Sequence, residues 1–205
     1  MASYLGFTVL DLTEPDRADG TRDEFERRIY ELNSQTGIRS VDVPSPADTV
    51  VREFQWASLS RAEVKVLRSF IDARNGRGIA FWLLGWEHDL RFLPGSESFE
   101  NPIFIDIVGY TANVFPIGSQ RRHLAVRDRT TNAVYFRKVL SALVTATEEQ
   151  LTLDSSMPAF DTDFATISFL RFARLDTDEP RIEWSGGQYA RCALPIRELP
   201  LETPA

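Results

Sequence analysis

The strongest constraint on the fold is a series of short apolar runs between residues 102 and 196. The runs are rich in β-branched and aromatic residues, and turn residues separate them. They cover residues 103–110, 123–127, 133–147, 167–175, 181–184 and 189–196. Short strands at such regular spacing are typical of antiparallel sandwiches and barrels. The last two runs flank Ser185-Gly186-Gly187, which predicts a β-hairpin.

One segment of the first hundred residues is clearly helical in pattern. Ser60 is a good N-cap with Glu63 at the capping-box position, and Asn75-Gly76 is a good stop signal. Apolar side chains follow a helical stripe at Val64, Leu67, Phe70 and Ile71. Charged side chains form the opposite face at Arg61, Lys65, Arg68 and Asp72.

Residues 5–12 form a short apolar stretch, and the runs at residues 50–59 and 79–86 predict strands. The run at 79–86 is apolar on both faces, so we expect a central strand that the helix covers on one side. Residues 23–32 are ambiguous, because Thr21 and Glu24 fit a helical capping box while a further β-like run follows at 38–43. We favour a hairpin over a helix there.

These patterns predict a mainly β chain, built from β-sandwich or barrel modules, with one principal α-helix at about residues 60–75. After Leu93-Pro94-Gly95-Ser96 the sequence changes to a series of short β-like runs separated by turn residues, which places a module boundary near residues 94–102. We therefore expect a β-rich module at residues 1–95, which carries the helix, and an antiparallel β module at residues 96–205.

The charge balance bears on the class of partner. The 205 residues include 23 Lys and Arg against 30 Asp and Glu, a formal net charge of −7. A dedicated nucleic-acid binder needs a cationic surface, so this balance disfavours that class. Lys65 and Lys138 are the only lysines, which leaves 21 arginines (23 less 2). The arginine excess fits either a bias of the source genome or the use of bidentate guanidinium groups in subunit contacts.

The single cysteine and the ends of the chain bear on the compartment. Cys192 alone cannot form an intramolecular disulfide, and it excludes multi-cysteine metal sites. The first residues lack a signal-peptide pattern, and no run approaches the ~18 apolar residues that a bilayer span needs. We expect a soluble, unsecreted chain without a membrane partner.

The sequence offers little catalytic chemistry. His88, within Glu87-His88-Asp89, gives a weak metal signal, because a metal site needs three or four convergent ligands. His123 follows two arginines and is expected at the surface, and Cys192 is expected to be a small core residue. No zinc-protease, nucleophile-elbow or phosphate-loop motif is present. We therefore predict no enzyme, no cofactor and no metal.

Two groups of carboxylates leave a hydrolase as an alternative function. Asp161 lies close to Asp163, and Asp176-Thr177-Asp178-Glu179 is expected to form a turn between strands, with cation binding as the alternative. A hydrolase would need two such carboxylates to converge on one cleft, with perturbed pKa values.

In residues 59–92, a capped helix, an Arg-x-Gly turn, an aromatic strand and an acidic residue follow one another, with the marks of the pattern at Phe70, Arg74, Gly76, Phe81, Trp82 and Asp89. This pattern resembles minor tail and tail-tip proteins of long-tailed bacteriophages, in particular the distal tail protein. The second segment, residues 167–200, is similar at Ala173-Arg174-Leu175-Asp176, Ile182-Glu183-Trp184 and Arg197-Glu198-Leu199-Pro200. Together the two segments cover about a third of the chain.

The resemblance implies a structural protein of the virion, made and assembled in the host cytoplasm. Such proteins form a ring, typically a hexamer, that joins the tail tube to the baseplate hub, and residues 1–95 would carry the contacts with the ring and tube. DNA passes through such a ring without being specifically bound, and an acidic lumen would keep the passage repulsive.

A ring needs two complementary surfaces on each subunit. We predict that the basic helix face (Arg61, Lys65 and Arg68) or the loop at Arg121 and Arg122 meets acidic residues of an adjacent copy. The alternative function is a carbohydrate-binding β-sandwich for host attachment, which would need exposed tryptophans such as Trp86 and Trp184.

Overall fold

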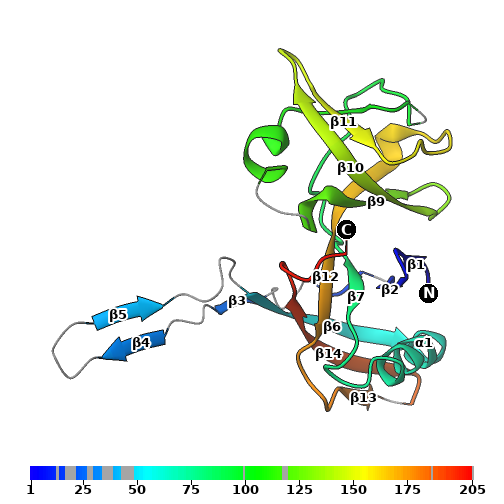
Figure 1. Cartoon of the computed structure of the whole chain (residues 1–205). Helices are drawn as coiled ribbons and strands as arrows, with labels where there is room; N and C mark the ends of the chain where they lie inside the picture. Colours follow the sequence, from blue (N-terminus) through cyan, green and yellow to red (C-terminus); the bar gives the residue numbers. More distant parts are fainter. Residues whose placement is uncertain are drawn as a thin grey trace. The chain divides into compact units, whose positions relative to one another are not determined.

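The computed structural model confirms a mainly β chain with one principal helix (Figure 1). It describes residues 1–12, 14–16, 22–26, 30–33, 39–42, 49–98, 100–116, 120–185 and 187–204. The chain packs into two compact units. Unit 1 comprises Met1–Asp11, Phe81–Phe172 and Glu202–Ala205, and unit 2 comprises Leu12–Ala80 and Ala173–Leu201.

This division differs from the predicted modules at 1–95 and 96–205. The predicted boundary near residues 94–102 lies inside the Phe81–Phe172 segment of unit 1. The reason is strand pairing between segments far apart in the sequence. Residues 81–84 lie beside residues 165–175 in the sheet, and residues 51–60 pair with residues 189–197. Local patterns mark where strands begin and end, but they do not say which strands pair.

Unit 1 is a mixed sheet in the order β1-β2-β7-β12-β9-β10-β11-β8. Its strands are β1 (Ser3–Tyr4), β2 (Phe7–Leu10), β7 (Phe81–Leu84), β8 (Ile103–Ile105), β9 (His123–Asp128), β10 (Val134–Val144), β11 (Glu149–Leu153) and β12 (Ala165–Leu175). All four residues of β7 are buried, and β7 lies between β2 and β12. This confirms the central position predicted for the apolar run at 79–86.

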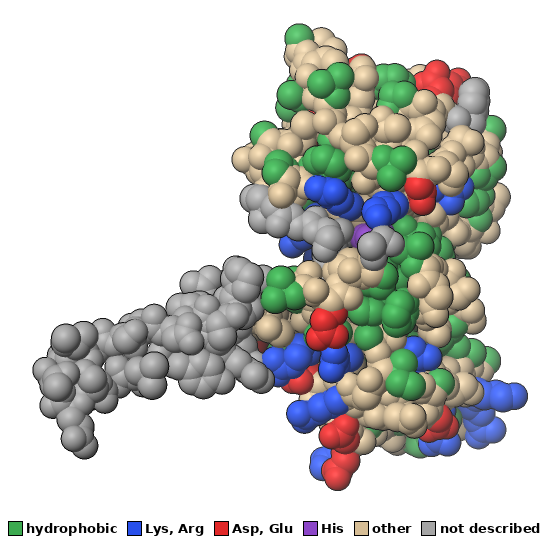
Figure 2. All heavy atoms as spheres, viewed as in Figure 1, with side chains coloured by type: hydrophobic (Ala, Val, Ile, Leu, Met, Phe, Trp, Pro, Cys, Tyr) green, Lys and Arg blue, Asp and Glu red, His purple; other side chains and the backbone are tan. Residues whose placement is uncertain are grey.

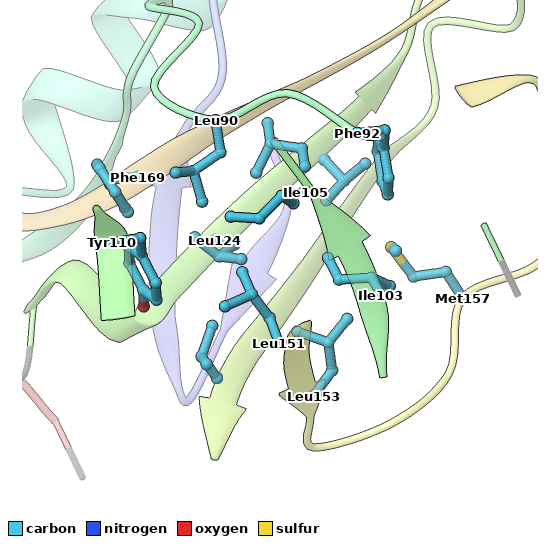
Figure 3. Packing of buried hydrophobic residues seen from close by; sticks show 13 residues of the cluster. Leu90, Phe92, Ile103, Ile105, Tyr110, Leu124, Leu151, Leu153, Met157 and Phe169 are labelled. Atoms are coloured by element: carbon cyan, nitrogen blue, oxygen red, sulfur yellow. The ribbon is translucent and has the colours of Figure 1, made fainter. Parts of the chain in front are cut away.

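The core of unit 1 lies against β8, β9, β11 and β12. Figure 3 shows Ile103, Ile105, Leu124, Leu151 and Phe169 converging from these strands. Tyr110 stacks on Phe169 with the ring centroids 5.9 Å apart, and its hydroxyl donates to the carbonyl of Arg121 at 2.8 Å. Burial of aliphatic and aromatic side chains is the main stabilising contribution here, at ~25 cal/mol per Å² of apolar surface.

Unit 2 is built on the antiparallel pairing of β6 (Thr49–Ser60) with β14 (Tyr189–Glu198). On its other side β14 pairs with β13 (Arg181–Ser185) and with the last residues of β12, and β3 (Arg22–Glu26) pairs with β6. The β13–β14 pair confirms the predicted hairpin. A separate antiparallel pair, β4 (Tyr30–Asn33) and β5 (Arg39–Asp42), confirms strands rather than a helix in that region.

The helix α1 spans Arg61–Asp72 and begins with the predicted capping box. The Glu63 N–H donates to Ser60 Oγ at 3.3 Å, and the Ser60 N–H donates to Glu63 Oε2 at 2.8 Å. Val64, Leu67 and Phe70 are buried, and α1 packs against β6 and β14. β7 belongs to unit 1 and α1 to unit 2, so the packing of the helix on the strand at 79–86 stays a prediction.

Candidate subunit interface

The cationic side chains predicted on the helix line an open hollow on unit 2. Its volume is about 580 Å³. The hollow is lined by Arg61, Val64, Lys65, Arg68, Ser69, Trp184 and Gly187, so it lies between α1 and the β13–β14 hairpin. We call it the α1 hollow. The sequence prediction of Arg61, Lys65 and Arg68 as one surface is thus matched by a single concave site.

Helical spacing places the three cations together. Residues 61, 65 and 68 are separated by four and three positions, which places them on one face over a rise of about 10 Å. All three are exposed. Figure 2 shows Lys and Arg side chains gathered over α1 at the lower right.

Arg61 also ties the helix to the hairpin. Its Nη2 and Nε donate to the carbonyl oxygen of Gly187, at 2.8 and 3.3 Å. Gly187 has a φ of +76°, a left-handed conformation that glycine adopts without a steric cost. A guanidinium has five N–H donors, so Arg61 keeps further donors for a ligand of the hollow. The side chains of Lys65 and Arg68 make no ion pair with any described residue.

Trp184 gives the α1 hollow an aromatic wall. It lies on β13 opposite Ala190 of β14, and 45% of its surface is exposed. Within the described part of the chain, β13 pairs only with β14, so its other edge is open. An indole face beside three cations suits a ligand that combines negative charge with a flat or apolar group.

The charged side chains that line the α1 hollow are all positive. None of its lining residues is acidic. Arg61 stands at the first helical position, where the positive end of the helix dipole disfavours a cation. Like charges four residues apart, such as Arg61 and Lys65, also destabilise a helix by about 0.2–0.5 kcal/mol. These charges therefore do not serve the stability of the helix, and a partner carboxylate would relieve both costs.

The other predicted interface residues, Arg121 and Arg122, lie in unit 1 at the end of a short 3₁₀ helix (η2, Gln120–Arg122). The Arg121 guanidinium lies over the ring of Phe169, 5.2 Å from its centroid. Arg122 lies over Phe115 at 4.4 Å, and its Nη2 donates to the Phe115 carbonyl at 3.4 Å. Both arginines therefore pack on aromatic rings of their own unit, and their role between subunits stays a prediction.

An exposed apolar surface on unit 1 was missed by the sequence reasoning. Leu140, Leu143 and Val144, near the end of β10, are each at least half exposed. The pairing of β10 with β11 is irregular between Val139 and Ser141, which interrupts the alternation of buried and exposed positions. Hydrophobic side chains are visible at the tip of this hairpin at the top of Figure 2. The sequence pattern at 133–147 predicts one continuous strand and does not show that its end faces solvent.

The residues that carry the resemblance to tail proteins have structural partners. In unit 2, Arg74 lies over the Phe70 ring at 5.2 Å and donates from Nη1 to the Ala80 carbonyl at 3.3 Å. In unit 1, the Trp82 indole N–H donates to the Tyr4 carbonyl at 3.0 Å. Asp89 Oδ2 accepts the N–H of Phe169 at 2.8 Å, and burial raises the pKa of Asp89 although this hydrogen bond opposes the shift.

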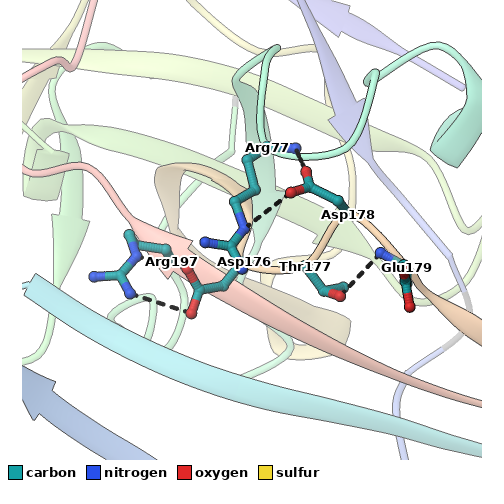
Figure 4. Close-up of polar contacts among 6 residues, drawn as sticks. All are labelled: Arg77, Asp176, Thr177, Asp178, Glu179 and Arg197. Atoms are coloured by element: carbon teal, nitrogen blue, oxygen red, sulfur yellow. Dashed lines mark hydrogen bonds and ion pairs between the residues drawn. The ribbon is translucent and has the colours of Figure 1, made fainter.

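The acidic segment 176–179 forms the predicted turn between β12 and β13 (Figure 4). Arg197 Nε donates to Asp176 Oδ1 at 2.8 Å, and Nη2 donates to Oδ2 at 3.2 Å. Asp178 Oδ1 accepts the backbone N–H of Arg77 at 3.0 Å. A Cβ at Gly76 would overlap the Asp178 carboxylate, so only glycine fits at this approach. The carboxylates of Asp176 and Asp178 are therefore engaged by Arg197 and Arg77 within unit 2.

The single cysteine and the two histidines also have defined structural environments. Cys192 is buried, as predicted, and burial raises the pKa of its thiol to about 11. His88 is exposed, with Nε2 2.8 Å from Arg129 Nη2. The prediction of a surface position for His123 is wrong, because β9 places this side chain in the interior with 1% exposure. Among the described residues, no group of three His, Cys, Asp or Glu side chains is arranged to hold a metal.

No protein-family model matches the chain, and no curated protein matches it. In the described ranges, no helix combines the length and the hydropathy needed to cross a bilayer.

Proposed function

We propose that this chain is a structural component of a bacteriophage tail. In this proposal it assembles into a hexameric ring at the tail tip, between the tail tube and the baseplate hub. The proposal rests on the resemblance of residues 59–92 and 167–200 to tail-tip proteins, and the mainly β fold agrees with it.

The α1 hollow is the observation that carries the proposal. Three exposed cations and a half-exposed indole line a concave surface that contains no acidic side chain. A surface of this kind is unbalanced in the isolated chain and is balanced when a complementary surface covers it. Ring contacts are heterologous, so each copy must present one surface that receives and another that inserts. The exposed apolar end of β10 supports the same role, because contiguous exposed apolar side chains mark interaction sites.

The charge of the chain suits a passage for DNA. With a formal net charge of −7, the assembled ring repels phosphate over most of its surface, while the cations of the α1 hollow are covered by subunit contacts. DNA can then cross the ring without being held.

Electron microscopy of the purified protein tests the proposal. We expect rings, alone or when tail-tube protein is added, and loss of the rings when Arg61, Lys65 and Arg68 are all changed to Glu. The control reverses three exposed arginines outside the hollow, Arg91, Arg181 and Arg191, and should leave the rings intact. A chain that stays monomeric with both tube and hub proteins would contradict the proposed function.

A carbohydrate-binding module for host attachment is the second candidate. The exposed face of Trp184 in the α1 hollow favours it, because sugar rings stack on exposed indole. Trp86 is half-buried and offers less surface. A glycan array distinguishes the candidates: binding that Trp184→Ala abolishes, in a chain that does not assemble, would support this function over the structural one.

A further inference from the structure

We propose that the α1 hollow of one copy receives the turn at residues 161–164 of a second copy. This inference rests on the proposed assembly of the chain into a ring, and it names the surface that complements the cationic face. We call residues 161–164 the acidic turn. Its sequence is Asp161-Thr162-Asp163-Phe164, and the short 3₁₀ helix η3 covers Thr162–Phe164.

The acidic turn presents two carboxylates and an aromatic ring to solvent. Asp161 and Asp163 are exposed, and neither forms an ion pair with a described residue. The Phe164 side chain is 59% exposed, so it offers an apolar face beside the two carboxylates. Negative charge and an apolar ring are the two features that the cations and the indole of the α1 hollow call for.

Hydrogen bonds hold the acidic turn in one conformation. Asp161 Oδ1 accepts the N–H of Asp163 at 3.0 Å, and Thr162 Oγ1 donates to the Ser96 carbonyl at 2.9 Å. The Arg129 N–H donates to the Phe164 carbonyl at 2.9 Å. A surface that is already ordered loses little conformational entropy when it binds. The turn is therefore a rigid element that can insert, and the α1 hollow is a preformed site that can receive it.

Several other carboxylates of the chain are already engaged. Asp11 pairs with Arg127 at 2.9 Å, Glu87 with Arg171 at 3.0 Å, and Asp176 with Arg197 at 2.8 Å. Glu149 is fully buried. The acidic turn differs from these residues because its charges are unpaired within the described chain and stand beside an exposed ring.

The size and placement of the two surfaces agree with docking. A hollow of about 580 Å³ is within the range of sites that enclose several side chains or a small molecule. The α1 hollow belongs to unit 2 and the acidic turn to unit 1, so the contact uses two different surfaces of the chain. Such a contact is heterologous, and when its rotation closes it produces a ring.

Two charge-reversed chains test the inference. The hollow-reversed variant carries Arg61→Glu, Lys65→Glu and Arg68→Glu, and the turn-reversed variant carries Asp161→Lys and Asp163→Lys. We expect each variant to self-associate at least tenfold more weakly than the wild type in sedimentation velocity at low salt. Mixed in equal amounts, the two variants should associate again, because the intact hollow of one meets the intact turn of the other and the acidic hollow meets the cationic turn. A chain with all five changes presents both surfaces with exchanged charge and should associate again.

Two further variants define the specificity of the contact. Phe164→Ala keeps both carboxylates but should weaken association, because it removes the ring that faces Trp184. Glu179→Lys with Glu183→Lys changes the net charge by the same amount as the turn-reversed variant, at exposed positions outside the α1 hollow. This control should associate like the wild type.

The outcomes separate this inference from the proposed function. Rings that survive in the turn-reversed variant but are lost in the hollow-reversed variant would overturn the inference and leave the tail role standing, since another ligand would fill the hollow. A wild-type chain that stays monomeric at millimolar concentration would also overturn it, because the docking needs a second copy. Failure to form rings with tube and hub proteins would instead contradict the tail role.

Discussion

Glu149 is a buried carboxylate that organises the backbone of unit 1. Its Oε1 accepts the N–H groups of Val108, Gly109 and Tyr110 at 3.0, 2.6 and 3.1 Å. Its Oε2 accepts the N–H and the hydroxyl of Thr111, both at 2.7 Å. Burial alone would raise the pKa of Glu149, but the hydrogen bonds from Thr111, Gly109 and Val108 outweigh it and lower the pKa. The side chain therefore satisfies donors at the start of the short π-helix η1 (Tyr110–Val114).

Glu149→Gln should lower the free energy of unfolding by about 2 kcal/mol, because the amide NH₂ cannot accept the Thr111 hydrogen bonds and leaves buried donors unsatisfied. Denaturant titration at pH 7 measures this change. Glu148→Gln is the matched control: its Oε1 accepts one hydrogen bond, from Gln150 at 2.9 Å, so a change within about 0.5 kcal/mol is expected. Since the pKa of Glu149 is lowered, its stabilisation is complete above about pH 4.5 and is lost as the pH falls through the folded-state value.

His123 links the stability of unit 1 to pH. Its Nδ1 lies 3.1 Å from the Tyr4 hydroxyl, and its ring lies 4.8 Å from that of Trp82. Burial, and next the charge of Lys138, lower the pKa of His123 to about 4, while Asp154 opposes the shift. Neutral imidazole is therefore the form that fits the interior.

Acidification should destabilise the protein well above the range in which carboxylates titrate. Between pH 6.5 and about 4 the unfolded state binds a proton on His123 that the folded state does not, so stability falls as the pH decreases. The full difference corresponds to about 3 kcal/mol. Denaturant midpoints at pH 5.0 and 6.5 measure the slope, and His123→Gln should reduce it. An unchanged slope in that variant would show that another group titrates.

At the scale of elements, the α1 cap is a local contribution that can be isolated. Ser60→Ala removes the hydrogen bond that Ser60 Oγ accepts from the Glu63 N–H, leaves the bond from the Ser60 N–H to Glu63 Oε2, and should cost about 1 kcal/mol of stability. Ser69→Ala is the control on the same helix, because Ser69 Oγ donates only to the Lys65 carbonyl at an exposed position. Alanine has the better helix propensity there, so the control should be neutral or slightly stabilising. Thermal unfolding measures the stability of both variants. An equal loss of stability in Ser60→Ala and Ser69→Ala would argue against the cap as the source of the effect.

The elements whose signals lie within a short stretch of sequence were predictable. The signals for α1 lie within sixteen residues, from Ser60 to Asn75, and the β13–β14 hairpin is marked by Gly186-Gly187. Glu149 had no such signal, because Glu148 precedes it with the same side chain, and only the pairing of β11 with β8 and β10 places Glu149 inside. His123 was misjudged for the same reason: two arginines precede it, and the strand that begins at His123 buries it.

The candidate interface divides in the same way. Helical spacing was enough to place Arg61, Lys65 and Arg68 together. The aromatic wall could not be derived, because Trp184 reaches the α1 hollow through the pairing of β14 with both β13 and β6. Contacts between residues more than a hundred positions apart have no counterpart in local patterns.

At the scale of the whole molecule, each unit needs segments from distant parts of the sequence. Residues 96–205 alone would leave β12 without β7 and β14 without β6. We expect this fragment to lack a cooperative unfolding transition, since its sheets would have open edges. Residues 12–80 joined to 173–201 by a flexible linker retain β6, α1, β13 and β14, and should unfold cooperatively. Circular dichroism during thermal unfolding compares the fragment with the linked chain. A cooperative transition in residues 96–205 would instead favour the modules predicted at residues 1–95 and 96–205.

Because Trp184 is partly exposed, tryptophan fluorescence can be used to follow the α1 hollow without an added label. Trp56 and Trp82 are buried and shielded from dissolved quenchers, Trp86 is half-buried, and Trp184 is 45% exposed beside three cations. Iodide, an anion, should be concentrated there and quench indole fluorescence more than neutral acrylamide does, with an excess that disappears as added chloride screens the charges. Any occupant of the hollow would displace the iodide, so fluorescence lifetimes would report in real time when this surface becomes covered.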